Sequence, residues 1–123
     1  VLREPLKNYS KGFKYIWDEI KVKIPLDSDI QKIKGTLHKI LNNNDIIKAI
    51  PTKMKKQLQT INTDYRIYYN QYEPVIYTEV VDNHVELQLR YLIHPKKARF
   101  VASTIWNKIL EAYKNNEIEL YKD

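Results

Sequence analysis

Alternating apolar and polar residues mark four stretches of the chain, a pattern that predicts β-strands with one buried face. These stretches cover residues 16–26, 75–81, 85–93 and 118–120. In the first stretch, residues 20–26 form the regular, half-buried part. Pro74 opens the second stretch, and a tight turn at Asp82-Asn83 joins it to the third. The sequence therefore predicts a hairpin late in the chain, one strand far before it and a short strand after it.

Two other stretches have apolar residues at intervals of three or four, which is typical of amphipathic helices. The first begins after Ser28 or Asp29, because either side chain can cap a helix, and it ends at the polar run 42–45. The second begins at Pro95, where the preceding strand stops, and ends at Asn115-Asn116. One helix thus follows the first strand, and the other follows the hairpin.

The region 46–72 allows two interpretations. Apolar residues at helical spacing predict another helix from about Pro51, which suits a first helical turn, to Tyr69. Because residues 63–72 are rich in β-forming side chains, a strand there is the competing interpretation.

The element order β-α-(α)-β-β-α-β predicts an α+β, ferredoxin-like fold, a four-stranded antiparallel sheet with helices on one face. We expect residues 1–15 to be an incoming strand or linker. Residues 16–123 then form the ferredoxin-like α/β domain, with a helical insertion at about 46–72. A length of 123 residues suits one such domain.

Composition narrows the classes of protein that the chain can represent. It has no cysteine, so a disulfide framework and a thiolate metal site are excluded. No apolar run reaches the length of a membrane helix, and the start is neither a signal peptide nor an initiating methionine. We therefore expect an excised piece of a longer protein. The net charge of +6 is uneven: residues 1–60 hold 13 Lys/Arg against 6 Asp/Glu, and the remainder holds 8 against 9.

No combination of residues predicts catalysis or a metal site. The three histidines lack metal-ligand spacing, and Asp27 and Asp29 suit helix capping better than cation binding. No serine has the surroundings of a nucleophile, and two glycines cannot form a phosphate-binding loop. Glu117 and Glu119 are typical of the wet face of a strand. We expect no enzyme and no cofactor.

Four basic residues near the start of the last helix form a candidate anion or partner contact. They are Arg90, Lys96, Lys97 and Arg99. Cations in a first helical turn oppose the macrodipole, so an anion held by these side chains and the free N–H groups of that turn would relieve an unfavourable arrangement. The alternative is a solvated face that meets carboxylates of another subunit.

The last helix also has more apolar surface than one sheet needs. Trp106, Leu110 and Tyr113 lie about 100° around it from the core stripe. Either the inserted helix or a neighbouring subunit must cover them, and we favour the subunit.

Four tyrosines could stack nucleobases, although core and interface packing is the more ordinary role. These tyrosines are Tyr65, Tyr68, Tyr69 and Tyr72.

Two long segments of the chain resemble parts of a known protein family. The first is Asn8-Tyr9-Ser10-Lys11-Gly12-Phe13-Lys14-Tyr15-Ile16-Trp17-Asp18-Glu19-Ile20. It resembles the segment where mechanosensitive channels of the small-conductance family leave their small β domain. Val85-Glu86-Leu87-Gln88-Leu89-Arg90-Tyr91-Leu92-Ile93-His94-Pro95-Lys96-Lys97 resembles their last hairpin strand and the following helix start. Residues 105–113 and 118–120 continue the resemblance in register. It covers about residues 5–48 and 73–121, and residues 49–72 have no counterpart in the shorter members.

The resemblance implies a cytoplasmic vestibule domain that assembles, usually as a heptamer, beneath a membrane pore. Residues 1–15 would then be the tail of the preceding β domain, and membrane helices would lie before them. Solutes would reach the pore through side openings between subunits. The rival hypotheses are an RNA-binding ferredoxin-like module and a small-ligand regulatory module. For the favoured reading we expect a homo-oligomer on the cytoplasmic side of the cell membrane, with no nucleic-acid partner.

Overall fold

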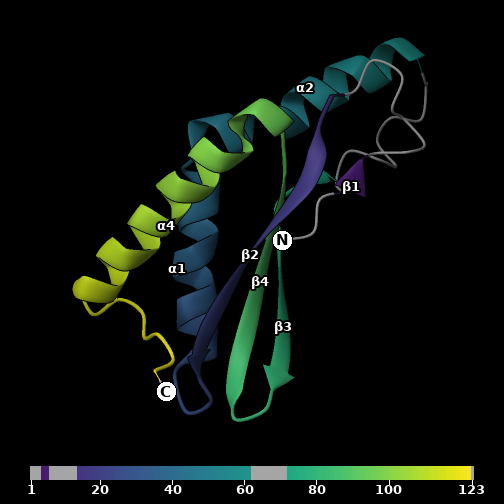
Figure 1. Cartoon of the computed structure of the whole chain (residues 1–123). Coiled ribbons are helices and arrows are strands. Elements are labelled where there is room, and N and C mark those ends of the chain that lie inside the picture. Colours follow the sequence, from purple (N-terminus) through teal and green to yellow (C-terminus); the bar gives the residue numbers. More distant parts are fainter. Residues whose placement is uncertain (1–3, 6–13, 62–71, 123) are drawn as a thin grey trace.

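The structure, a computed structural model, describes residues 4–5, 14–61 and 72–122. These residues form one antiparallel sheet with helices packed against it. The strands are β1 (Glu4–Pro5), β2 (Ile16–Pro25), β3 (Val75–Val81) and β4 (His84–Ile93). The helices are α1 (Ile30–Asn42), α2 (Asp45–Ile61), the short 3-10 helix η3 (Pro95–Lys97) and α4 (Ala98–Lys114). The described residues therefore form an α+β fold (Figure 1).

The three long strands lie in the order β2-β4-β3, with β4 in the middle. The two residues of β1 extend the sheet beyond β2 by pairing with Ile16 and Trp17. β3 and β4 form the predicted hairpin, and Asp82 has a positive φ of 53° at its turn. Two-residue hairpin turns require such left-handed conformations, which aspartate tolerates better than most residues. The turn at Asp82-Asn83 is thus confirmed without the glycine that commonly follows aspartate or asparagine.

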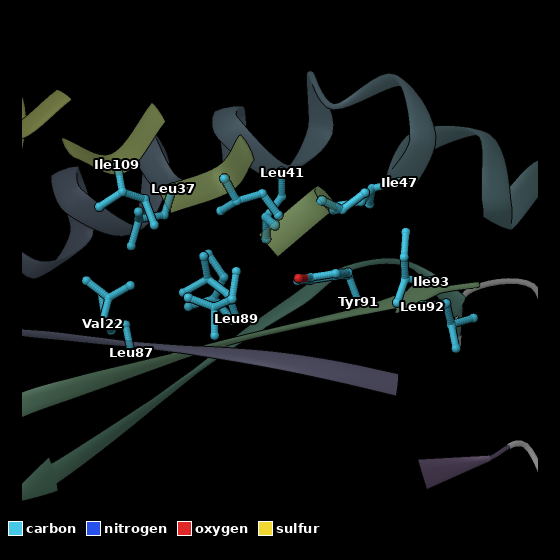
Figure 2. Close-up of a cluster of buried hydrophobic side chains, with 14 of the residues drawn as sticks. Val22, Leu37, Leu41, Ile47, Leu87, Leu89, Tyr91, Leu92, Ile93 and Ile109 are labelled. Carbon is cyan, nitrogen blue, oxygen red and sulfur yellow. The ribbon is translucent and has the colours of Figure 1, made fainter. Parts of the chain in front are cut away.

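The core lies between the sheet and the helices, because apolar residues of β2 and β4 occupy the parity that faces the helices. The buried inward-facing pairs across these strands are Ile20 and Leu89, Val22 and Leu87, and Ile24 and Val85. In Figure 2, helix side chains such as Leu37 and Ile109 point towards Val22 and Leu89 of the strands. This single layer of helices leaves the other face of the sheet to mostly polar side chains.

Polar side chains explain where α1 and α2 begin. Asp29 caps α1, because its Oδ1 accepts a hydrogen bond from the Lys32 backbone N–H at 3.2 Å. Asn44 caps α2, because its Oδ1 accepts from the backbone N–H groups of Ile46 and Ile47, each at 3.1 Å. The second helix therefore starts well before Pro51, which lies inside α2 and not in its first turn as expected.

The predicted strand at 118–120 is wrong, so the sheet has three long strands and not four. The chain stays close to α4 after its end, where the Glu117 N–H still bonds to the Ala112 carbonyl oxygen at 2.9 Å. Ile118 is buried in the core, but strand pairing does not follow. Instead the Tyr121 N–H donates to the Lys23 carbonyl oxygen of β2 at 2.8 Å. The segment thus reaches the edge of β2 only near its end, too late to form a ladder.

The predicted end of the second helix at Tyr69 lies outside the described residues, and so does most of the competing strand at 63–72. The same holds for Tyr65, Tyr68 and Tyr69. Tyr72 is described and is buried in the core.

Candidate functional site

One flank of α4 presents large apolar side chains that the described residues leave partly uncovered. The stripe facing the sheet is fully buried and consists of Ala98, Val101, Ile105, Ile109 and Ala112. Trp106 and Leu110 point to the side, with exposed fractions of 36% and 45%. Tyr113 is half-buried beside them, and the Lys122 ammonium lies 5.2 Å from the centre of its ring. We call Trp106, Leu110 and Tyr113 the α4 flank.

The inserted helix α2 does not cover the α4 flank. α1 runs beside α4, whereas α2 extends away past the opposite end of the sheet (Figure 1). The part of the predicted insertion beyond Ile61 lies outside the described residues up to Gln71. The described part of the insertion therefore leaves Trp106 and Leu110 partly exposed.

A groove of about 610 Å³ lies on the opposite side of α4, between that helix and α1. Buried Ile105 and Ala112 contribute to its lining from α4, and Ile40 contributes from α1. Phe100 stands at its rim with 64% of its surface exposed. Glu111 and Glu117 also line it. We call this cavity the α1–α4 groove. α4 thus has an apolar projection on one side and, on the other, a recess that mixes apolar side chains with polar and charged ones such as Lys39 and Lys108.

The four predicted basic residues do not form one cluster. Arg90 lies on the face of the sheet opposite the helices, since the neighbouring residues of β4 point into the core. There its Nε is 3.9 Å from Oε2 of the buried Glu19, and its guanidinium lies 5.6 Å from the centre of the Trp17 ring. Arg99 is exposed on α4, and helical spacing places it on the same side as Trp106. Arg90 therefore belongs to the polar sheet face, and Arg99 borders the α4 flank.

Lys96 and Lys97 line a cavity of about 560 Å³ at the end of the sheet where β2 begins and β4 ends. Lys53 of α2 is the third lysine of this cavity, and His94 stands beside them. The wall is apolar and includes Ile46, Ala49 and Ile50 of α2. We call this cavity the lysine pocket. It combines residues that are distant in the sequence, so only the course of α2 reveals it.

His94 changes the expected chemistry of this turn. Its Nδ1 accepts a hydrogen bond from the Lys96 backbone N–H at 3.1 Å, and its carbonyl oxygen accepts from the Lys97 N–H at 2.8 Å. These N–H groups are therefore not free, contrary to expectation, and the lysine side chains are the groups available to an anion. With Nδ1 as an acceptor, a neutral His94 carries its proton on Nε2.

The described residues contain no group of three or more His, Asp or Glu side chains that could hold a metal ion. Asp29 is engaged as a helix cap, as the sequence predicted in preference to cation binding. None of the described helices has the length and apolar character needed to cross a membrane.

No protein-family model matches the chain, and no curated protein matches it significantly. The resemblance to mechanosensitive channels therefore depends on the quoted segments alone.

Proposed function

We propose that the chain is a vestibule domain of a channel of the small-conductance mechanosensitive type, acting as one subunit of a homo-oligomeric ring on the cytoplasmic side of the membrane. The observation that carries the proposal is the α4 flank, where Trp106 and Leu110 are the size of core residues yet stay exposed. Large apolar side chains gathered on one surface commonly mark a protein interface. The two sequence segments that resemble the channel family supply the identity of the assembly.

The fold fits this proposal as a ferredoxin-like unit without its fourth strand. The order β2-β4-β3 with helices on one face is the order of the first three strands of that fold. The missing strand would pair with the part of the β2 edge that β1 leaves open, where Tyr121 already bonds to Lys23.

A head-to-tail contact between copies explains both sides of α4. Trp106 and Leu110 of one copy enter the α1–α4 groove of the next, so each copy uses one projection and one recess. Heterologous contacts of this kind close into rings when the rotation between copies allows it. Charge contributes little to this pairing, because Lys39 and Lys108 line the recess together with Asp45, Glu111 and Glu117.

In such a ring the domain acts mechanically and electrostatically. It holds the pore subunits in register, and its lining influences which solutes reach the pore. The net charge of +6 enriches anions close to the ring, and salt screens this effect beyond about 8 Å in the cell.

The alternative of an RNA-binding module has less support. RNA-binding modules of this topology stack bases on aromatic residues of the open sheet face. Here the aromatic residues of that face stand among charged side chains, and Trp17 is already covered by the Arg90 guanidinium, 5.6 Å from its ring centre.

The test is the molecular mass of the chain in solution, measured by sedimentation equilibrium over a wide range of concentrations. We expect self-association that the double substitution Trp106→Ser and Leu110→Ser removes without lowering the urea midpoint. Leu26→Ser is the matched control, because Leu26 is similarly exposed, at 49%, but lies in the turn after β2. A parent chain that stays monomeric at the highest concentration contradicts the assembly proposal.

A further inference from the structure

The lysine pocket has a charge arrangement that calls for a partner. The side chains of Lys53, Lys96 and Lys97 are exposed at its edge. Among the described residues, none of these three ammonium groups has a carboxylate within salt-bridge distance. Asp45 is the acidic residue of the lining, but it is 90% exposed and lies 3.2 Å from Lys48. The positive charge at the pocket is therefore largely uncompensated within this part of the chain.

The helix adjoining the pocket increases this imbalance. Lys96 and Lys97 belong to η3, directly before α4, and the positive end of the α4 macrodipole lies beside them. Two cations at this end raise the free energy of the arrangement, whereas an anion there would lower it. The backbone N–H groups of both lysines already bond to His94, so the anion would contact the ammonium groups.

The wall of the lysine pocket also favours a ligand with an apolar part. Ile46 and Ala49 are half-buried and Ile50 is buried, so the floor offers apolar contact to a bound molecule. Tyr15 adds an aromatic ring at the start of β2. A volume of about 560 Å³ lies within the range of small-molecule sites, which are mainly apolar with a few polar groups that orient the ligand.

We propose that the lysine pocket binds a small amphiphilic anion, with a phosphate or carboxylate head on the lysines and an apolar body against α2. A bare inorganic anion would leave the apolar wall unused, and a neutral apolar molecule would leave the lysines unpaired. The proposal does not rest on ring assembly, but the pocket shares Asp45 and Ile46 with the α1–α4 groove. Binding is therefore measured both in the parent chain and in the Trp106→Ser and Leu110→Ser variant, which leaves the pocket residues unchanged.

Isothermal titration calorimetry of the whole chain with octyl phosphate tests this inference. Inorganic phosphate represents the charged head group without the apolar body, and octanol represents the apolar body without the charge. We expect octyl phosphate to bind at least about tenfold more tightly than either fragment. Equal binding of octanol and octyl phosphate would overturn the role of the lysines. Equal binding of inorganic phosphate would overturn the role of the wall, and no binding of any probe at millimolar concentration would overturn the whole inference.

Substitutions locate the site. Lys53→Gln with Lys97→Gln should weaken octyl phosphate binding about tenfold or more, the effect of losing charge-assisted hydrogen bonds. The control is Lys23→Gln with Lys32→Gln, which removes the same charge from exposed positions elsewhere and should change binding less than about twofold. Equal weakening by both pairs would mean that binding depends on net charge alone, and it would overturn the site.

A third variant tests the apolar wall. Ala49→Trp fills the pocket from α2 and should abolish octyl phosphate binding while inorganic phosphate binding changes little. Thermal unfolding of this variant checks that the fold is intact, and the exposed lysine variants test the site if it is not. Vesicles containing phosphatidic acid distinguish the source of the anion. Lysine-dependent vesicle binding indicates a lipid headgroup, and lysine-dependent binding of octyl phosphate alone indicates a free small molecule.

Discussion

The ring of Tyr121 stacks on the imidazole of His84, with centroids 4.7 Å apart and planes inclined by 26°. The Tyr121 hydroxyl also donates to Asn83 Oδ1 at 2.9 Å, next to the hairpin turn. With the backbone bond to Lys23, these contacts fasten the end of the chain to the sheet at the turn between β3 and β4. Tyr121 thus joins the segment after α4 to the end of the sheet at the hairpin turn.

Replacing His84 by phenylalanine should stabilise the fold. Only 6% of His84 is exposed, and neither ring nitrogen has a hydrogen-bond partner among the described residues. A phenyl ring at this position would keep the stacking without a buried polar group, so we expect the free energy of unfolding to rise by about 1 kcal/mol. Urea denaturation measures this change. Tyr121→Ala removes the stacking partner and should lower the same quantity by about 1 kcal/mol. A destabilised His84→Phe variant would show that a ring nitrogen makes an essential contact.

Gln88 should matter more than its position at the surface suggests. Glu79 and Glu86 are directly opposite each other on β3 and β4, and the Gln88 Nε2 donates to both carboxylates, at 2.6 and 3.0 Å. Like charges opposite each other destabilise a sheet, so Gln88→Leu should cost about 1–2 kcal/mol of unfolding free energy.

A double-mutant cycle separates this effect from lost packing. In a Glu79→Gln background, the cost of Gln88→Leu should fall by at least half, because one of the opposed charges is gone. An unchanged cost in that background would mean that the amide does not act through the two carboxylates.

Asn44 should contribute a full helix cap. Its Oδ1 satisfies two backbone N–H groups at the start of α2, so Asn44→Ala should lower the free energy of unfolding by about 1 kcal/mol. Asn42→Ala is the matched control, since Asn42 is exposed at the last position of α1, and it should change stability by less than about 0.5 kcal/mol. Thermal or urea denaturation measures both, and equal effects would refute the capping role.

Mixing two interface variants distinguishes a head-to-tail contact from a symmetric one. The first carries Trp106→Ser and Leu110→Ser on the α4 flank, and the second carries Thr104→Arg in the α1–α4 groove. Each should be monomeric by sedimentation. Their equimolar mixture should form dimers, because one intact projection and one intact groove remain available. If the flank pairs with the flank of another copy, the Thr104→Arg variant should still associate by itself.

Local patterns predicted those parts of the fold that local forces determine. The alternating patterns of β2 and β4 predicted these strands correctly, because both strands bury every second residue against the helices. The start of α2 could not be read from Pro51, since the Asn44 side chain satisfies the first N–H groups and sets an earlier start. The segment 118–120 has the alternation of a strand, and Ile118 is buried. It does not pair with β2, because the chain is still bonded to α4 at Glu117 and first bonds to β2 at Tyr121.

The sequence predicted a candidate site where local spacing determines it, and missed the site that depends on the tertiary fold. The surplus apolar side of α4 follows from helical spacing alone. The lysine pocket could not be predicted, because Lys53 meets Lys96 only through the path of α2. The position of Arg90 could have been foreseen, since it alternates with Leu89 and Tyr91 and must face away from the helices.

The chain has two tryptophans, and their surroundings make them separate optical probes. Trp17 lies under the Arg90 guanidinium on the sheet, whereas Trp106 stands on the outer side of α4. In a Trp17→Phe variant, the remaining emission comes from an indole that meets water in the lone subunit. The emission maximum of Trp106 should therefore shift to shorter wavelength when copies associate and to longer wavelength when α4 unfolds. One fluorescence spectrum can thus follow both events without a label.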